Sequence, residues 1–216
     1  MNNNPCRGRF ITIEGIEGVG KTTSSKFLLN YLQEKKLSVV ATREPGGTAI
    51  SEEIRSILLK PQEETMCFET ELLLVFASRA QHVAQVIEPA LQRGEWVLCD
   101  RFTDATYAYQ GGGRGIKEER IALLEKWVLA SFCPDLTILL HAPEKIALTR
   151  AKNRSSTSDR FEAETEYFFK RVQDTYFKRA QDFPERYRLV NANQTLEAVQ
   201  AQLKKIVDEY LSVSNQ

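Results

Sequence analysis

The sequence predicts an α/β fold of three layers, in which a five-stranded, mostly parallel sheet carries helices on both faces. Three observations predict it. Five short runs are β-branched or apolar, longer segments with helical spacing separate them, and a glycine-rich loop joins the first run to the first helical segment. Strands that alternate with helices are typical of βαβ units, in which right-handed crossovers join parallel strands.

The expected strands are short, and several are apolar at successive positions, as in strands that a parallel sheet buries on both faces. They cover residues 10–13 (FITI), 38–42 (SVVAT), 96–99 (WVLC), 136–140 (LTILL) and 187–190 (YRLV). The expected helices cover residues 22–34, 49–59, 69–93, 117–131, 162–182 and 195–211. Since no linker interrupts this alternation, we expect a single domain over residues 1–216.

Two stretches lack a periodic pattern. Consecutive glycines in residues 110–115 (QGGGRG) preclude regular structure, and residues 153–159 (NRSSTSD) are polar and lie between Arg150 and Arg160. We interpret the second stretch as part of a flexible lid, about residues 150–162, that carries cations. The alternative for either stretch is an ordinary surface loop.

The composition disfavours several classes of function. Lysine plus arginine equals aspartate plus glutamate at 29 each, so we expect neither nucleic acid nor membrane as a partner. No run reaches the ~18 apolar residues of a membrane helix. Four scattered cysteines without a C-x-x-C pair favour free thiols over a zinc site or disulfides. The start, MNNNPCRGR, lacks the apolar region of a signal peptide, so the sequence predicts a cytoplasmic protein.

The segment EGIEGVGKTT (residues 14–23) contains the pattern G-x-x-x-x-G-K-[ST] between an apolar run and a helical segment. Glycines let backbone N–H groups close around a β-phosphate, and the helix N-terminus adds partial positive charge. Lys21 can reach the β- and γ-phosphates, and the Thr22 hydroxyl can bind Mg²⁺. The pattern predicts a P-loop NTPase fold with an ATP-type site formed by Gly15, Ile16, Glu17, Gly18, Val19, Gly20, Lys21 and Thr22.

An acidic residue at the end of another buried strand would complete this site. Asp100 follows the run WVLC directly and is, with Thr22, our candidate ligand for Mg²⁺. Arg101 comes next, where a guanidinium can hold a second phosphate through two hydrogen bonds.

Arginines indicate which phosphate chemistry the chain performs. The sequence has no N-K-x-D motif for guanine, which disfavours a GTPase switch. Arg79 lies within an expected helix, and further arginines flank the lid, where a closing segment would neutralise transition-state charge and exclude water. The pattern favours phosphoryl transfer to a small, phosphorylated acceptor, and the expected catalytic residues are Lys21, Arg101, Arg150, Arg154 and Arg160.

The chain resembles the bacterial thymidylate kinases from about residue 9 to residue 211, and five motifs in the same order carry the resemblance. They are EGIEGVGKTT, TREPGGT (42–48), DRF (100–102), AYQGGGRG (108–115) and DRFE (159–162). The resemblance implies transfer of the γ-phosphoryl group of ATP to dTMP, giving dTDP and ADP for dTTP synthesis, with Mg²⁺ as cofactor. It also implies a homodimer packed through helices.

The resemblance further implies roles for individual residues. Glu17 would face the sugar 3′-hydroxyl and pair with Arg101, which would hold the phosphate of dTMP. Arg79 would bind the base carbonyl, Thr106 would lie against the thymine edge, and Tyr109 would pack beneath the deoxyribose. The full expected set for substrate binding is Glu17, Arg43, Pro45, Phe76, Arg79, Arg101, Thr106, Tyr109 and Gln110.

One departure from the family pattern concerns the base. The family commonly has an aromatic residue four positions before the helix arginine, whereas this chain has Val75 there and Phe76 next to it. Either Phe76 reaches the base from the same helix face, or it belongs to the core and the stacking partner comes from elsewhere. The base preference is therefore open, and one rival function is a kinase for uridylate or guanylate. A second rival, of a different class, is a regulator that hydrolyses ATP slowly.

Overall fold

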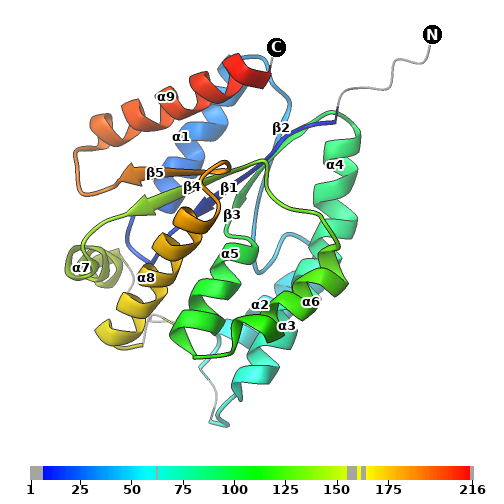
Figure 1. Ribbon diagram of the computed structural model, residues 1–216, viewed down its shortest axis with the longest axis vertical. Coiled ribbons are helices and arrows are strands. Elements are labelled where there is room, and N and C mark those ends of the chain that lie inside the picture. The colour runs from blue at the N-terminus through cyan, green and yellow to red at the C-terminus, as the bar shows by residue number, and fades with distance from the viewer. Residues whose placement is uncertain (1–6, 62, 155–159, 162–163, 215–216) are drawn as a thin grey trace.

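The fold is built on a five-stranded parallel sheet, shown in Figure 1. The computed structural model describes residues 7–61, 63–154, 160–161 and 164–214. In sheet order, the strands are β2 (Val39–Arg43), β3 (Trp96–Asp100), β1 (Phe10–Glu14), β4 (Leu136–His141) and β5 (Tyr187–Asn191). All four neighbouring pairs run parallel, so the predicted sheet is confirmed, with boundaries that shift by one residue at most.

Helices cover both faces of the sheet. Figure 1 shows α1 (Lys21–Glu34) and α9 (Leu196–Ser214) together on one face and α8 (Glu166–Asp182) on the other. The remaining described helices are α2 (Ala49–Leu59), α3 (Phe68–His82), η1 (Val83–Ile87), α4 (Glu88–Gln92), α5 (Thr103–Thr106), η2 (Tyr107–Gly113), α6 (Glu118–Leu129) and α7 (Glu144–Arg154). None of the described helices is long and apolar enough to cross a membrane.

The central strand β1 shows why these runs form a sheet core, because all five of its residues are buried. The Phe10 ring packs edge-on against Phe102, with ring centroids 4.9 Å apart. The Thr12 and Thr137 hydroxyls share a hydrogen bond of 3.0 Å across β1 and β4, which satisfies two polar groups buried between apolar neighbours. Burial on both faces selects the apolar, β-branched sequence of β1.

The expected helix 69–93 is found as three consecutive pieces, α3, η1 and α4. The middle piece, η1, is a π-helix, and Pro89 follows it within the first turn of α4. Proline has no backbone N–H to donate, so it fits a first helical turn far better than a helix interior. The π-helical turn thus lets the chain continue past Pro89 without ending the helix.

The expectation of irregular structure at residues 110–115 is wrong for most of that stretch. The segment η2 continues α5 as a π-helix through Gly113. It packs against α8, where a Cβ on Gly113 would lie 2.4 Å from the Phe168 ring, and the Arg171 side chain donates to the Gly113 carbonyl. The glycines therefore allow close helix packing here rather than a loop.

Helix α7 was not expected from the sequence, and it takes up the first part of the predicted lid. Arg150 and the backbone of Arg154 belong to this helix, and the Arg154 side chain lies outside the described residues. Residues 155–159 and 162 of the predicted lid also lie outside them, whereas residues 160–161 are described.

The close approach of η2 and α8 generates a stability prediction. Gly112→Ala should lower the free energy of unfolding by about 1–3 kcal/mol, because the added Cβ would lie 2.1 Å from Thr175 Oγ1 and 2.9 Å from the Arg171 carbonyl oxygen. The matched control is Gly111→Ala, whose Cβ would lie 3.3 Å from the flexible end of Ile121 and 3.8 Å from the Ile116 carbonyl oxygen, and which should change stability by less than about 1 kcal/mol. Urea unfolding followed by circular dichroism measures both, and equal effects would contradict this packing.

Candidate active site

The phosphate loop lies between β1 and α1, and its backbone conformation requires glycine. Gly15, Gly18 and Gly20 have φ values of +134°, +76° and +90°. A Cβ on Gly18 would also lie 1.8 Å from the Ala147 carbonyl oxygen, so only glycine fits there. The loop therefore leads into the N-terminus of α1 with its backbone free to surround an anion.

Lys21 lies folded over this loop. Its ammonium group donates to the Gly15 carbonyl at 2.9 Å and to the Ile16 carbonyl at 2.8 Å. Burial, and after it Arg101, lower the Lys21 pKa to about 8 against the opposite effect of Asp100. A bound polyanion would supply the charge that this buried ammonium lacks.

A cleft beside the loop, here named the phosphate-loop cleft, brings the predicted metal ligands together. Thr22 and Asp100 both line it, and Asp100 Oδ1 is buried without a hydrogen-bond partner among the described residues. An unpartnered carboxylate oxygen next to a hydroxyl suits a hydrated Mg²⁺, so these residues fit the metal. The cleft is lined by Glu17, Gly18, Gly20, Lys21, Thr22, Arg43, Glu44, Arg55, Asp100 and Arg101.

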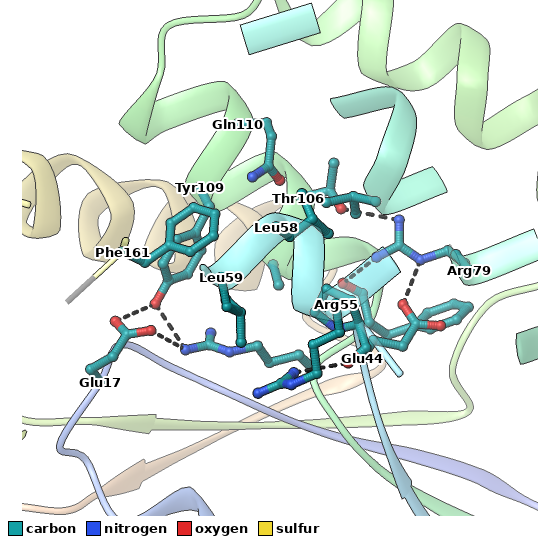
Figure 2. A pocket seen from close by; sticks show the side chains of 15 residues that line it. Glu17, Glu44, Arg55, Leu58, Leu59, Arg79, Thr106, Tyr109, Gln110 and Phe161 are labelled. Atoms are coloured by element: carbon teal, nitrogen blue, oxygen red, sulfur yellow. Dashed lines mark hydrogen bonds and ion pairs between the residues drawn. The ribbon is translucent and has the colours of Figure 1, made fainter. Parts of the chain in front are cut away.

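A second cavity, here named the inner cavity, adjoins this cleft. Figure 2 shows its side chains, with Glu17 at one end and Arg79 at the other. It is lined by Glu17, Glu44, Pro45, Arg55, Leu58, Leu59, Val75, Arg79, Arg101, Phe102, Ala105, Thr106, Tyr109, Gln110 and Phe161. All the predicted substrate-binding residues line one of the two cavities except Phe76.

Glu17 and Arg101 form the expected ion pair at the junction of the two cavities. Arg101 Nη2 donates to Glu17 Oε1 at 2.7 Å, and the Tyr109 hydroxyl donates to Glu17 Oε2 at 2.6 Å, as Figure 2 shows for Tyr109. Burial alone would raise the pKa of Glu17, but Arg101 and then Lys21 bring it below its usual value. The carboxylate is therefore charged, and its pairing offsets its repulsion of phosphate.

Arg79 is buried at the far end of the inner cavity. It donates to Glu44 Oε2 at 2.7 Å, to the Thr106 hydroxyl at 3.0 Å and to the Phe102 carbonyl at 3.0 Å. His82 Nδ1 lies 3.0 Å from the other oxygen of Glu44. These contacts fix the guanidinium before any ligand arrives.

Sequence reasoning missed several side chains around these cavities. The resemblance places residues 43–47 along the acceptor pocket but gives Glu44 no role of its own, and His82 lies outside every motif. Arg55, which donates to the Pro45 carbonyl at 2.8 Å, lines both cavities from α2. The position of Glu44 directly after β2, at the carboxyl edge of the sheet, was the available signal for it.

Phe76 does not line the inner cavity and belongs to the core. It is 2% exposed and packs with Leu72, Tyr107 and Ile121, because α3 turns this side of the helix toward η2 and α6. Val75 lines the cavity instead, and Phe102 and Phe161 supply aromatic rings. Of the two possibilities left open by the sequence, the core position is the one found.

The two described lid arginines do not line the phosphate-loop cleft. Arg150 donates to the Ala192 carbonyl at 2.9 Å. Arg160 donates to the Leu58 carbonyl at 3.0 Å and to Glu71 Oε2 at 2.5 Å, so buried Glu71 draws it toward α2 and α3. The structure thus gathers Lys21 and Arg101, but not these two, around the phosphate loop.

Comparison with known proteins identifies the family. A family model described as thymidylate kinase matches residues 13–203. The chain belongs to the thymidylate kinase family. Thymidylate kinases of Vesicomyosocius okutanii and Pseudomonas syringae pv. tomato are each 55% identical to it, over 93% and 95% of this chain and 98% of each relative. The crystal structure of thymidylate kinase from Ehrlichia chaffeensis is 33% identical, with a TM-score of 0.75 over 93% of this chain and 99% of that one.

Membership of the thymidylate kinase family confirms two predictions. The fold is the P-loop NTPase fold, and the chain is a kinase that phosphorylates dTMP to dTDP with ATP. The roles of individual residues stay predictions, which the geometry of the two cavities supports.

The position of Lys21 generates a prediction of pH dependence. The lowered pKa of about 8 means that free enzyme loses this charge as the pH rises above 8, so kcat/KM for ATP should fall by up to about tenfold per pH unit there. Lys21→Arg should be slower throughout but should lack this alkaline decline, because a guanidinium stays charged. Initial rates between pH 6.5 and 9.5 measure both proteins. The same decline in the variant would assign it to another group.

Proposed function

We propose that the chain holds ATP in the phosphate-loop cleft and dTMP in the inner cavity when it transfers the γ-phosphoryl group between them. One observation carries this arrangement: Arg101 and Glu17 line both cavities. The phosphate of a nucleotide in the inner cavity would meet the γ-phosphate of ATP at the same guanidinium. In-line transfer needs both phosphates held at one point.

The inner cavity suits a thymine nucleotide. Arg79, Thr106 and Gln110 offer polar groups for the edge of a base, and Leu58 and Val75 are among the apolar side chains that could contact its methyl group. Tyr109 lies at the Glu17 end, where the sugar would pass between base and phosphate. We therefore place the base near Arg79 and the phosphate near Arg101.

Both terminal nitrogens of the Arg101 side chain already have protein partners. Nη1 donates to the Gly15 carbonyl and the Tyr176 hydroxyl, and Nη2 to Glu17 and the Tyr109 hydroxyl. A phosphate arriving from the inner cavity would replace Glu17 on Nη2. The released carboxylate would then be free to accept a hydrogen bond from the sugar 3′-hydroxyl.

Catalysis would depend on position and charge rather than on a strong base. The acceptor oxygen of dTMP is already anionic, so its attack needs no proton transfer. Lys21 and Arg101 would neutralise the charge that spreads over the transferring group. Mg²⁺, when bound by Thr22 and through water by Asp100, would neutralise part of the charge on the β- and γ-phosphates.

We further propose that the chain works in the cytoplasm. Cys67, Cys99 and Cys133 are free thiols, which is usual for proteins of a reducing compartment. ATP is supplied there as phosphoryl donor.

The substrate prediction is tested by ADP release from Mg·ATP with each nucleoside monophosphate offered separately. We expect rapid release with dTMP, slow release with dUMP, UMP and GMP, and little without an acceptor or without Mg²⁺. A preference for UMP or GMP would keep the kinase chemistry and overturn the base assignment. Release that does not depend on any acceptor would favour a regulator that hydrolyses ATP.

A homodimer is proposed from an exposed apolar surface on α3 and α6. Leu73 of α3 and Leu123 and Trp127 of α6 are 55%, 69% and 81% exposed, and α3 lies beside α6 in Figure 1. Apolar side chains gathered on neighbouring helices are typical of a subunit contact.

Sedimentation velocity tests this surface. We expect a species of twice the chain mass of 24.6 kDa, and a monomer for the double variant Leu123→Glu with Trp127→Glu. The matched control is Leu189→Glu on β5, which is 48% exposed elsewhere and should leave the mass unchanged. A wild-type species of single chain mass would contradict the dimer.

A further inference from the structure

Glu14, the last residue of the central strand β1, is a buried carboxyl to which neither the sequence motifs nor the proposed reaction gives a role. It is 0% exposed and lies at the carboxyl edge of the sheet. Its Oε1 accepts a hydrogen bond of 2.7 Å from the Phe102 backbone N–H, and its Oε2 accepts one of 2.7 Å from the Tyr176 hydroxyl of α8. Both partners are neighbours of Arg101, because Arg101 directly precedes Phe102 in the chain and its side chain donates to the Tyr176 hydroxyl.

The first of these contacts holds the backbone of Arg101. This residue has φ +72°, a left-handed conformation that is costly for a residue with a side chain. The backbone is fixed on both sides, because the Arg101 N–H donates to the Ile13 carbonyl at 2.9 Å and the next N–H, of Phe102, donates to Glu14. Glu14 therefore stabilises the turn that aims Arg101 at the junction of the two cavities.

The second contact holds the side chain. The Tyr176 hydroxyl donates its one proton to Glu14, so its lone pairs face Arg101 Nη1 at 3.2 Å. Nη1 also donates to the Gly15 carbonyl at 2.9 Å. Nη1 thus faces the protein interior, whereas Nη2 faces Glu17 and the cavities.

We propose that Glu14 and Tyr176 are positioning residues that fix Arg101 for the phosphate shared by the two nucleotides. This inference rests on the proposed function, in which a phosphate replaces Glu17 on Nη2. During that exchange, Tyr176 and the Gly15 carbonyl keep Nη1 in place, so the guanidinium meets the phosphate without losing its orientation. Pre-orientation of this kind lowers the entropic cost of binding.

The test uses Tyr176→Phe, which removes only the hydroxyl. We expect the Kd for dTMP, measured by calorimetry, to rise about tenfold and kcat to fall. The Kd for thymidine, which shares base and sugar but has no phosphate, should stay within about twofold, since Arg79 and the base end of the cavity are unaltered. A larger rise in Kd for dTMP than for thymidine supports the positioning role, because a general loss of packing would weaken the binding of both ligands.

The matched control is Tyr187→Phe. This tyrosine is also buried, but its hydroxyl has no hydrogen-bond partner among the described residues, so its loss should leave both Kd values and kcat near those of the wild type. Thermal unfolding of each variant checks that the protein is folded.

A second variant, Glu14→Gln, keeps an oxygen that can accept from the Phe102 N–H and replaces the other oxygen with a donor. We expect it to weaken dTMP binding while sparing thymidine, and to add little to Tyr176→Phe in the double variant, because both act through one hydrogen bond. It also tests the proposal if Tyr176→Phe does not fold.

Each other outcome has a definite meaning. Equal weakening of dTMP and thymidine, or no weakening of either, would overturn the positioning role while wild-type turnover of dTMP keeps the proposed function intact. A wild-type protein that fails to phosphorylate dTMP would overturn the proposed function itself, and this inference with it.

Discussion

The site depends on one constraint, the fixed orientation of Arg101 at the carboxyl edge of the sheet. Its left-handed backbone, φ +72°, directs the side chain to the junction of the phosphate-loop cleft and the inner cavity. Its terminal nitrogens contact the loop carbonyl of Gly15, Glu17, and two tyrosine hydroxyls from η2 and α8. Because these partners come from elements that are distant in sequence, the guanidinium has all of them only when the whole domain is folded.

Several buried carboxylates elsewhere in the described structure are paired with arginines. Asp104 accepts hydrogen bonds from Arg179 and Arg186, which bring its pKa down to about 2 against the opposite effect of burial. Glu71 pairs with Arg160 and Arg114, and Glu44 with Arg79. Removing one member of such a pair would leave an uncompensated charge in the interior. Of these pairs, Glu44 and Arg79 line the inner cavity, so an ion pair holds that part of its wall in place.

Much of the fold could be predicted because the relevant signals are local. The five strands are short apolar runs, and burial on both faces leaves little other choice of sequence. The segment η2 and helix α7 could not be predicted in this way. The three glycines in η2 resemble a loop in the sequence, and only the packing shows that Gly112 and Gly113 must be small where they meet α8. Helix α7 has a polar sequence whose helical spacing is weak.

The sequence by itself determined the phosphate loop, the Asp100–Arg101 pair and the family, because each depends on residues contiguous in the chain. Only the tertiary structure decided which face of α3 lines the inner cavity, and so placed Val75 there and Phe76 in the core. It also decided that Arg160 pairs with Glu71 rather than lining the phosphate-loop cleft. The partner of a long side chain depends on which groups lie near it and on how deeply they are buried. Both are determined only when elements distant in sequence pack together.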